Sequence, residues 1–374
     1  MESRDSIAFI RAAYAEHALQ DKENETLIAA YGELSTEEAQ RVAAWALDEL
    51  PPEAPGWSPG APIVQDDEGE EGLDRDKILL MLACLVPNAL EPVHRTLAER
   101  GIFHPSILYR GADADTRDFL LELHARQEPA STESSLVDAL SWIGGERVAG
   151  YFRQHGMDAV QREAGWELLP DGTTQRLWVD GCHALVRTEP DLSTTNADPV
   201  NVGVQHEERC EWCGKTLSTL FDLRLSTGQL DFLGLAGERL RIATCDPCTG
   251  YGTIFTDIDF AGLSTWSSHN VRPEYIGGGD YDRLPERQVT LGRARRTPVE
   301  CYWEVYDWEG ASQLGGHPTW LQPRAAYPEC PSCHHSMRFI GQLATSLLEE
   351  FGEGITYAYL CTLCNIAATN YQQT

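Results

Sequence analysis

The chain has 374 residues, of which 42% are hydrophobic, and its 58 acidic residues outnumber 29 lysines and arginines, for a formal net charge of −29. This composition is typical of soluble globular proteins, and no apolar run reaches the roughly 20 residues that span a bilayer, which argues against a membrane protein. Because negative charge repels phosphate backbones, the balance also argues against nucleic-acid binding. An acidic surface favours a basic protein partner, although it also serves solubility alone.

The first 160 residues predict an all-helical domain. Ser35-Thr-Glu-Glu38 has the capping-box pattern that opens a helix, and Pro51-Pro52 would stop it. Residues 51–75 are rich in proline, glycine and acid, and are predicted to form an acidic loop. Polar residues at the start show no signal peptide, so we expect a cytoplasmic protein. Apolar patterning predicts further helices over residues 76–86, 88–100, 114–126, 134–143 and 146–155.

The last two predicted helices flank a turn at Gly144-Gly145. A helix, a glycine turn and a Glu-Arg-Val opening of the second helix resemble one HEAT-type repeat. Such helical pairs bury their apolar faces by stacking on neighbouring pairs. We therefore expect a HEAT-like domain over residues 1–160, with an ordinary helical bundle as the alternative.

From about residue 161 the pattern changes to short apolar or alternating runs separated by Gly, Asp and Pro, which is typical of strands. The prediction is an α+β multidomain protein, in which a mostly β domain covers residues 161–374. Strands are predicted at residues 220–225, 230–233, 240–242, 253–256, 302–306 and 355–360.

Eight of the eleven cysteines fall in four CxxC pairs. Two thiolates at this spacing bind one side of a metal ion, and two pairs complete the tetrahedral shell of a Cys₄ zinc site. Four sulfurs leave no open coordination position, so these zinc-ribbon-like sites would be structural. We expect two Zn²⁺ ions, one held by Cys210, Cys213, Cys245 and Cys248, the other by Cys330, Cys333, Cys361 and Cys364.

The spacing leaves several alternatives open. The pairs could bind in a crossed arrangement, the first with the third, and iron could replace zinc. Cys330-Pro-Ser-Cys333-His334 fits the CxxCH pattern of haem attachment, and a single CxxC fits a thioredoxin-like redox pair, but neither explains four matched pairs. His334 and His335 are expected to be exposed. Of the other cysteines, Cys84 and Cys182 are predicted to be buried.

The two halves of the predicted β domain also match between their cysteines. The apolar residues after Cys213 and after Cys333 have the same offsets, which suggests that one supersecondary unit is used twice. These residues are Leu217, Leu220 and Leu223 in one half, and Met337, Ile340 and Leu343 in the other.

The run Leu314-Gly-Gly-His-Pro-Thr-Trp-Leu-Gln322, with Cys330-Pro-Ser-Cys333 and Met337-Arg-Phe-Ile-Gly-Gln-Leu343 after it, resembles a pattern of the YwqG-like bacterial family and of the eukaryotic programmed cell death protein 2 family. The resemblance covers about residues 310–374, extends weakly to about residue 200, and does not include the helical part. It implies a β-rich zinc-binding fold in which Pro318 and Trp320 pack a glycine turn on the sheet. On the eukaryotic side it implies a cytoplasmic chaperone of a basic ribosomal protein.

These patterns predict a non-enzymatic protein-binding module, stabilised by zinc, for a basic client such as a ribosomal protein or a toxin that the chain neutralises. No serine elbow, HExxH or phosphate-binding loop is present, so no catalytic residue is assigned. The alternative is an enzyme of unknown reaction with its pocket between the helical and β domains. A third labile metal or one reactive low-pKa thiol would favour the enzyme.

Overall fold

A computed structural model describes residues 5–18, 25–48, 75–126, 133–157, 162–187, 200–277, 285–299, 311–322, 325–349 and 352–373. The chain divides into two compact units, Met1–Gln175 and Arg176–Thr374. The predicted acidic loop lies outside the described residues except for Arg75, and so do Cys301 and the strand predicted over 302–306.

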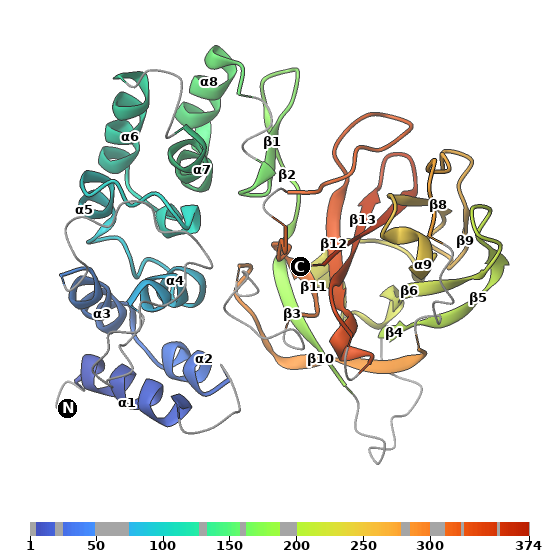
Figure 1. Ribbon diagram of the computed structural model, residues 1–374, viewed down its shortest axis with the longest axis horizontal. Coiled ribbons are helices and arrows are strands. Elements are labelled where there is room, and N and C mark those ends of the chain that lie inside the picture. The colour runs from blue at the N-terminus through green and yellow to red at the C-terminus, as the bar shows by residue number, and fades with distance from the viewer. Residues whose placement is uncertain are drawn as a thin grey trace. The chain divides into compact units, whose positions relative to one another are not determined.

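Short helices make up most of the first unit (Figure 1). Within the described residues, no helix combines the length and the apolar character that crossing a membrane requires. The elements are α1 (Ser6–Ala18), α2 (Glu25–Gly32), α3 (Thr36–Asp48), α4 (Arg75–Leu85), α5 (His94–Glu99), the 3₁₀ helix η1 (Ser106–Tyr109), α6 (Ala114–Arg126), α7 (Glu133–Ile143), α8 (Gly145–His155), and the strands β1 (Trp166–Leu168) and β2 (Thr174–Arg176).

The predicted capping box is confirmed at the start of α3. The Ser35 N–H donates to the Glu38 carboxylate at 2.9 Å, and the Glu38 N–H donates to the Ser35 hydroxyl at 3.3 Å. The helix predicted over residues 88–100 is much shorter, because only His94–Glu99 are α-helical. Asn88 follows Pro87 with a φ of 62°, a left-handed conformation that cannot continue a right-handed helix.

The expectation of an all-helical, HEAT-like N-terminal domain is wrong. Among the residues that the structure describes, no helix of this unit is longer than 13 residues, and the unit also contains the β1–β2 pair. In addition, α7 packs mainly against η1 and α6 and only slightly against α8. From β1, Trp166 stacks on Phe152 of α8 with ring centroids 6.1 Å apart, and its indole N–H donates to the Ser141 carbonyl of α7 at 2.9 Å. The glycine hairpin therefore does not form a stacked repeat.

A large sheet forms the second unit (Figure 1). Its strand order is β5-β6-β4-β10-β3-β11-β12-β13-β14-β8-β9, and β7 pairs with the free side of β6. The strands are β3 (Val179–Arg187), β4 (Val200–Val202), β5 (Val204–Arg209), β6 (Thr216–Arg224), β7 (Arg239–Thr244), β8 (Ile254–Ile258), β9 (Ser264–Trp266), β10 (Arg287–Arg295), β11 (Gln313–Gly316), β12 (Arg338–Ala344), β13 (Ile355–Cys361) and β14 (Ile366–Gln372). The helical turns are η3 (Leu225–Thr227), η4 (Asp231–Leu233), α9 (Asp246–Thr249) and η5 (Thr345–Leu347).

The strands of this sheet repeat in chain order. The first set is β3, β4, β6, η3, β7 and β8, and the second is β10, β11, β12, η5, β13 and β14. The pairing registers match as well: Ser218 is opposite Thr244, just before Cys245, and Arg338 is opposite Leu360, just before Cys361. Each β6–β7 and β12–β13 ladder also carries a bulge at the same place, after Thr219 in one and after Phe339 in the other.

The two repeats exchange their first strands. In the first repeat β4 pairs with β10, which belongs to the second, and in the second repeat β11 pairs with β3, which belongs to the first. The exchanged strands pair with each other around Thr290 and Val186. The sheet is therefore continuous across both repeats, and neither repeat completes its own sheet.

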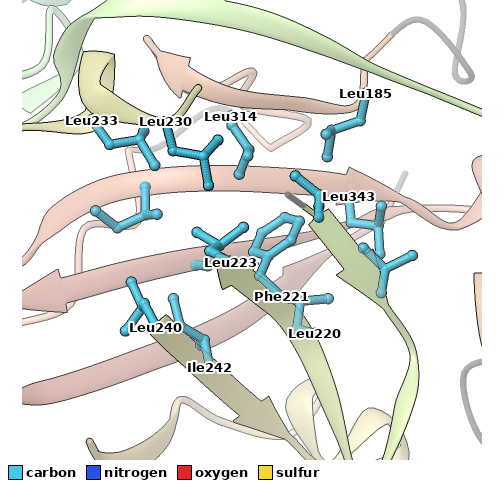
Figure 2. Packing of buried hydrophobic residues seen from close by; sticks show 14 of the residues in the cluster. Leu185, Leu220, Phe221, Leu223, Leu230, Leu233, Leu240, Ile242, Leu314 and Leu343 are labelled. Carbon is cyan, nitrogen blue, oxygen red and sulfur yellow. The ribbon is translucent and has the colours of Figure 1, made fainter. Parts of the chain in front are cut away.

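A shared hydrophobic core joins the repeats. Leu220 and Leu223 from β6 lie in the same buried cluster as Leu343 from β12 (Figure 2), and Ile340 of β12 belongs to this cluster as well. These are the residues that matched by offset in the sequence. The other faces of β12, β13 and β14 pack into a second cluster that includes Tyr357, so these strands are buried on both faces.

Two details of the second unit depend on left-handed glycines. The strand predicted over residues 230–233 is instead η4, because Gly228 and Gly234 adopt φ values of 73° and 63° on either side of it. Gly315 has a φ of 68° where β11 crosses β3, and a Cβ there would lie 2.0 Å from the Gly181 carbonyl oxygen.

Replacement of Gly315 by alanine should destabilise the second unit by roughly 3 kcal/mol or more, because the left-handed strain adds to a clash with backbone. Gly234→Ala is the matched control, since it has a similar φ but nothing within 4 Å of the added Cβ. We expect this control to lose only about 1 kcal/mol. Urea unfolding of both variants measures the difference, and equal midpoints would contradict the role given to the β3–β11 crossing.

His94 makes the first unit sensitive to acid. Its ring is buried, Nε2 lies 2.9 Å from the Leu108 carbonyl oxygen, and Nδ1 has no hydrogen-bond partner. Burial lowers the pKa of His94 from 6.5 to about 4, against the opposing effects of that carbonyl and Asp113. Between pH 6.5 and pH 4, His94 therefore binds a proton in the unfolded chain but stays neutral in the folded chain. The free energy of unfolding accordingly decreases as the pH falls from 6.5 towards 4.

We expect His94→Gln to remove about 2 kcal/mol of the stability difference between pH 7 and pH 5. Urea unfolding followed by far-ultraviolet circular dichroism at both pH values measures this difference against the wild-type chain. An unchanged pH dependence in the variant would show that His94 does not carry the effect.

Candidate metal centres

The structure brings the eight predicted cysteine ligands together in two clusters. Within each, the four sulfur atoms all lie within 4.8 Å of one another. The arrangement is the sequential one, and the crossed pairing does not occur. The first cluster is Cys210, Cys213, Cys245 and Cys248, and the second is Cys330, Cys333, Cys361 and Cys364.

The sulfur distances fit a metal ion at the centre of each cluster. Cys210 and Cys248 are 3.8 Å apart at Sγ, Cys213 and Cys245 are 3.5 Å apart, and the Cys333–Cys361 distance is 3.7 Å. A tetrahedron with metal–sulfur bonds of about 2.3 Å has sulfur–sulfur edges of about 3.8 Å. All eight thiols are free rather than joined in disulfides. The clusters are therefore compatible with two bound metal ions.

The first CxxC of each cluster closes the same hairpin turn. The Cys210 N–H donates to the Lys215 carbonyl and the Gly214 N–H to the Cys210 carbonyl, at 2.9 and 2.8 Å. In the second cluster Cys330, His334 and His335 form the same two bonds, both 2.8 Å long. His334 takes the place of Gly214 with a φ of 61°. Its conformation explains the CxxCH pattern, and the exposed imidazoles of His334 and His335 are not needed as ligands.

The second CxxC of each cluster lies where a strand ends. Cys245 and Cys248 flank the start of α9, where the Thr249 N–H and hydroxyl both donate to the Cys245 carbonyl, at 2.9 and 2.7 Å. Cys361 ends β13, and Asn365, with a φ of 55°, turns the chain into β14. Two different turns therefore present the same pair of sulfurs.

Both clusters are embedded in apolar and aromatic side chains. Cys210, Cys245 and Cys248 are buried with Leu217 and with Trp212, whose ring meets Trp266 edge-on at 5.6 Å. The second cluster lies in the core that contains Tyr357 and Phe339. Cys213 is the exposed sulfur of the first cluster. Away from the clusters, the predictions that Cys84 and Cys182 are buried are confirmed.

Proton sharing among the thiols distinguishes one cysteine in each cluster. Hydrogen bonding among the thiols of Cys210, Cys245 and Cys248 lowers the pKa of Cys210 and raises the pKa values of the other two. Burial opposes ionisation of Cys333, but its bonds to the His335 backbone and neighbouring thiols lower its pKa to about 6, and the pKa of Cys361 rises to about 12. Four thiolates this close would repel one another, so full ionisation requires a central cation.

The segment that carried the family resemblance packs beside the second cluster. Trp320 lies against Tyr327 and Tyr357, with ring centroids 5.1 and 5.3 Å away. Two buried glutamines hold the backbone of this segment: Gln342 accepts from the Thr319 N–H at 2.8 Å, and Gln372 from the Leu321 N–H at 3.0 Å. Sequence reasoning missed these glutamines, whose polar side chains in apolar strands were the available signal.

A β-ladder connects the two metal centres. The strand after Cys248 is β8 and the strand after Cys364 is β14, and these strands pair with each other. At one end of the ladder the Ile258 N–H donates to the Asn365 carbonyl at 2.9 Å, beside the second cluster. Near the first cluster, the hydroxyls of Thr244 and Thr369 lie 2.8 Å apart in the core. A well-ordered cluster at one centre therefore stabilises, through the β8–β14 ladder, the strand that follows the other cluster.

Comparison with known proteins identifies one related sequence. The chain is 30% identical over 283 residues to the uncharacterized protein YpfL of Salmonella typhimurium, an alignment that covers 71% of this chain and 64% of YpfL. The chain thus spans less than two thirds of that relative's length. No protein-family model matches the sequence, and no solved structure matches it.

Replacing Cys213 by alanine should reduce the bound metal from two ions per chain to one. Because Cys213 is exposed, this change removes a ligand with little loss of core packing. We also expect faster chelator-induced release of the remaining ion, since disorder at the first cluster loosens β8, the partner of β14. Cys84→Ser, at a buried cysteine outside both clusters, should keep two ions. Elemental analysis and release kinetics measure both effects, and two ions retained in Cys213→Ala would contradict the assignment.

Proposed function

We propose that the chain is a non-enzymatic protein-binding module, stabilised by two structural zinc ions, that binds a basic protein. The observation that carries this proposal is the pair of closed Cys₄ clusters. With four sulfur ligands each, such sites hold an ion without leaving a position for water or substrate. Their contribution is then to fold and rigidify the sheet that presents a surface.

Zinc is the metal that we propose for both sites. Tetrahedral thiolate sites select zinc or iron, and zinc serves the structural role because it has no redox chemistry that would disturb the cluster. Elemental analysis of freshly purified protein tests the choice. Colourless protein with two zinc ions per chain is expected, whereas coloured protein with stoichiometric iron would overturn it.

The charge of the chain supports a basic partner. With 58 acidic residues against 29 basic ones, the surface attracts cationic proteins and repels nucleic acids. The resemblance of residues 310–374 to the programmed cell death protein 2 family agrees with a basic client, and a ribosomal protein or a neutralised toxin is the kind of client that we propose.

The tagged full chain should therefore retain a basic protein from lysate of its native cell at low salt. Surface ion pairs are screened as the Debye length falls from about 10 Å at 0.1 M salt to about 3 Å at 1 M, so the complex should dissociate over that range. Prior removal of zinc by a chelator should abolish capture, because the sheet loses its order. Recovery of no basic protein, or capture that ignores salt and chelator, would contradict the proposal.

A further inference from the structure

Two large apolar side chains project into solvent beside the first cysteine cluster. Val271 is 84% exposed and Tyr275 is 73% exposed. The ring of Tyr275 meets that of Tyr251 edge-on, with centroids 5.9 Å apart. The Tyr251 N–H donates to the carbonyl of the ligand Cys248 at 2.9 Å. We call Tyr251, Val271 and Tyr275 the tyrosine surface. Tyr251 is thereby attached to the turn that carries two of the sulfur ligands.

The segment that carries Val271 and Tyr275 is anchored on both sides of them. Before Val271, the side-chain amide of Asn270 bonds both backbone groups of Phe255 on β8, and each of these two bonds is 2.7 Å long. After Tyr275, Ile276 packs on the apolar cluster around the first metal centre. The backbone that carries these two exposed side chains is therefore fixed at both ends. A backbone that is already fixed lets these side chains pack against a partner at a lower entropic cost of ordering.

Acidic side chains lie next to the tyrosine surface. Tyr371 approaches Gly250, the neighbour of Tyr251, since a Cβ at Gly250 would lie 3.8 Å from its ring. The Tyr371 hydroxyl donates to the Glu353 carbonyl at 2.6 Å, so the loop that carries Glu353 lies at the end of this ring. Glu349 belongs to the same loop, since the Glu349 N–H donates to the Thr345 carbonyl and the Thr345 N–H to the Gly354 carbonyl, both at 3.0 Å. Both glutamates are exposed, and among the described residues neither carboxylate forms an ion pair.

We propose that the tyrosine surface, with the carboxylates of Glu349 and Glu353 beside it, docks a basic segment of a protein partner. This inference rests on the proposed function and assigns it a surface. An apolar side chain of the partner packs on Val271 and Tyr275, and arginines or lysines contact the carboxylates and the faces of the tyrosine rings. A second copy of the chain does not fit, because two strongly acidic chains repel each other at this face.

The test uses the full zinc-loaded chain and a fluorescent synthetic peptide of alternating arginine and leucine, followed by anisotropy. Two double variants probe the surface: Val271→Ser with Tyr275→Ala, and Glu349→Gln with Glu353→Gln. Each has a matched control elsewhere on the second unit. Leu263→Ser with Leu363→Ser removes two other exposed apolar side chains, 57% and 78% exposed. Glu207→Gln with Glu286→Gln removes two other exposed carboxylates.

Each surface variant should weaken peptide binding about tenfold, while the controls change it less than about twofold. If the Glu349/Glu353 variant and the Glu207/Glu286 control weakened binding equally, the net charge alone would bind the peptide. That result would overturn the assigned surface without contradicting the proposal that the partner is basic. Failure of the wild-type chain to bind the peptide at low salt would also overturn it. Circular dichroism and zinc content establish that each variant is folded, and capture of the native client tests the proposed function separately.

Discussion

The gathering of four sulfur atoms at the ends of strands is the constraint on which the second unit depends. Each cluster joins a hairpin turn to the end of the following strand, so one ion bound there would fix β6 and β7, or β12 and β13, at one end. The sulfur–sulfur distances match the edges of a metal–thiolate tetrahedron. Four thiolates at these distances would repel one another, and a bound cation would remove that repulsion while fixing the register of both ladders.

The two centres are not independent. Their outgoing strands, β8 and β14, form one ladder, and Thr244 and Thr369 bond across the core. The exchange of β3 and β10 between the repeats adds a second connection at the other side of the sheet. A duplicated unit usually yields two separable domains, but here each repeat supplies a strand that the other lacks. Folding of the sheet must therefore bring together residues far apart in the chain, such as Gly315 and Gly181.

The first cysteine cluster and the proposed docking surface are linked through short stretches of chain. The Tyr251 N–H donates to the carbonyl of Cys248, and Asp246 lies between two of the cysteines in the same turn. An ion bound at this cluster would therefore act on the proposed partner only indirectly, by fixing the backbone that presents the aromatic side chains. This division of roles agrees with centres that are closed to substrate.

The metal ligands could be predicted from the sequence, because the CxxC spacing places two thiols close enough to bind the same ion. The capping box at Ser35 and the matching offsets of Leu220 and Ile340 could also be predicted, because each depends only on residues that are close together in the chain. The HEAT-like prediction failed because the apolar residues of α7 and α8 do not reveal which elements pack against them. In the structure α7 packs mainly against η1 and α6, and Trp166 of β1 stacks on Phe152 of α8. The sequential pairing of the clusters, the strand exchange and the place of Val271 and Tyr275 were decided only in three dimensions. Each depends on which distant backbone groups complete a ladder or bury a face, and local patterns of residues carry no information about those partners.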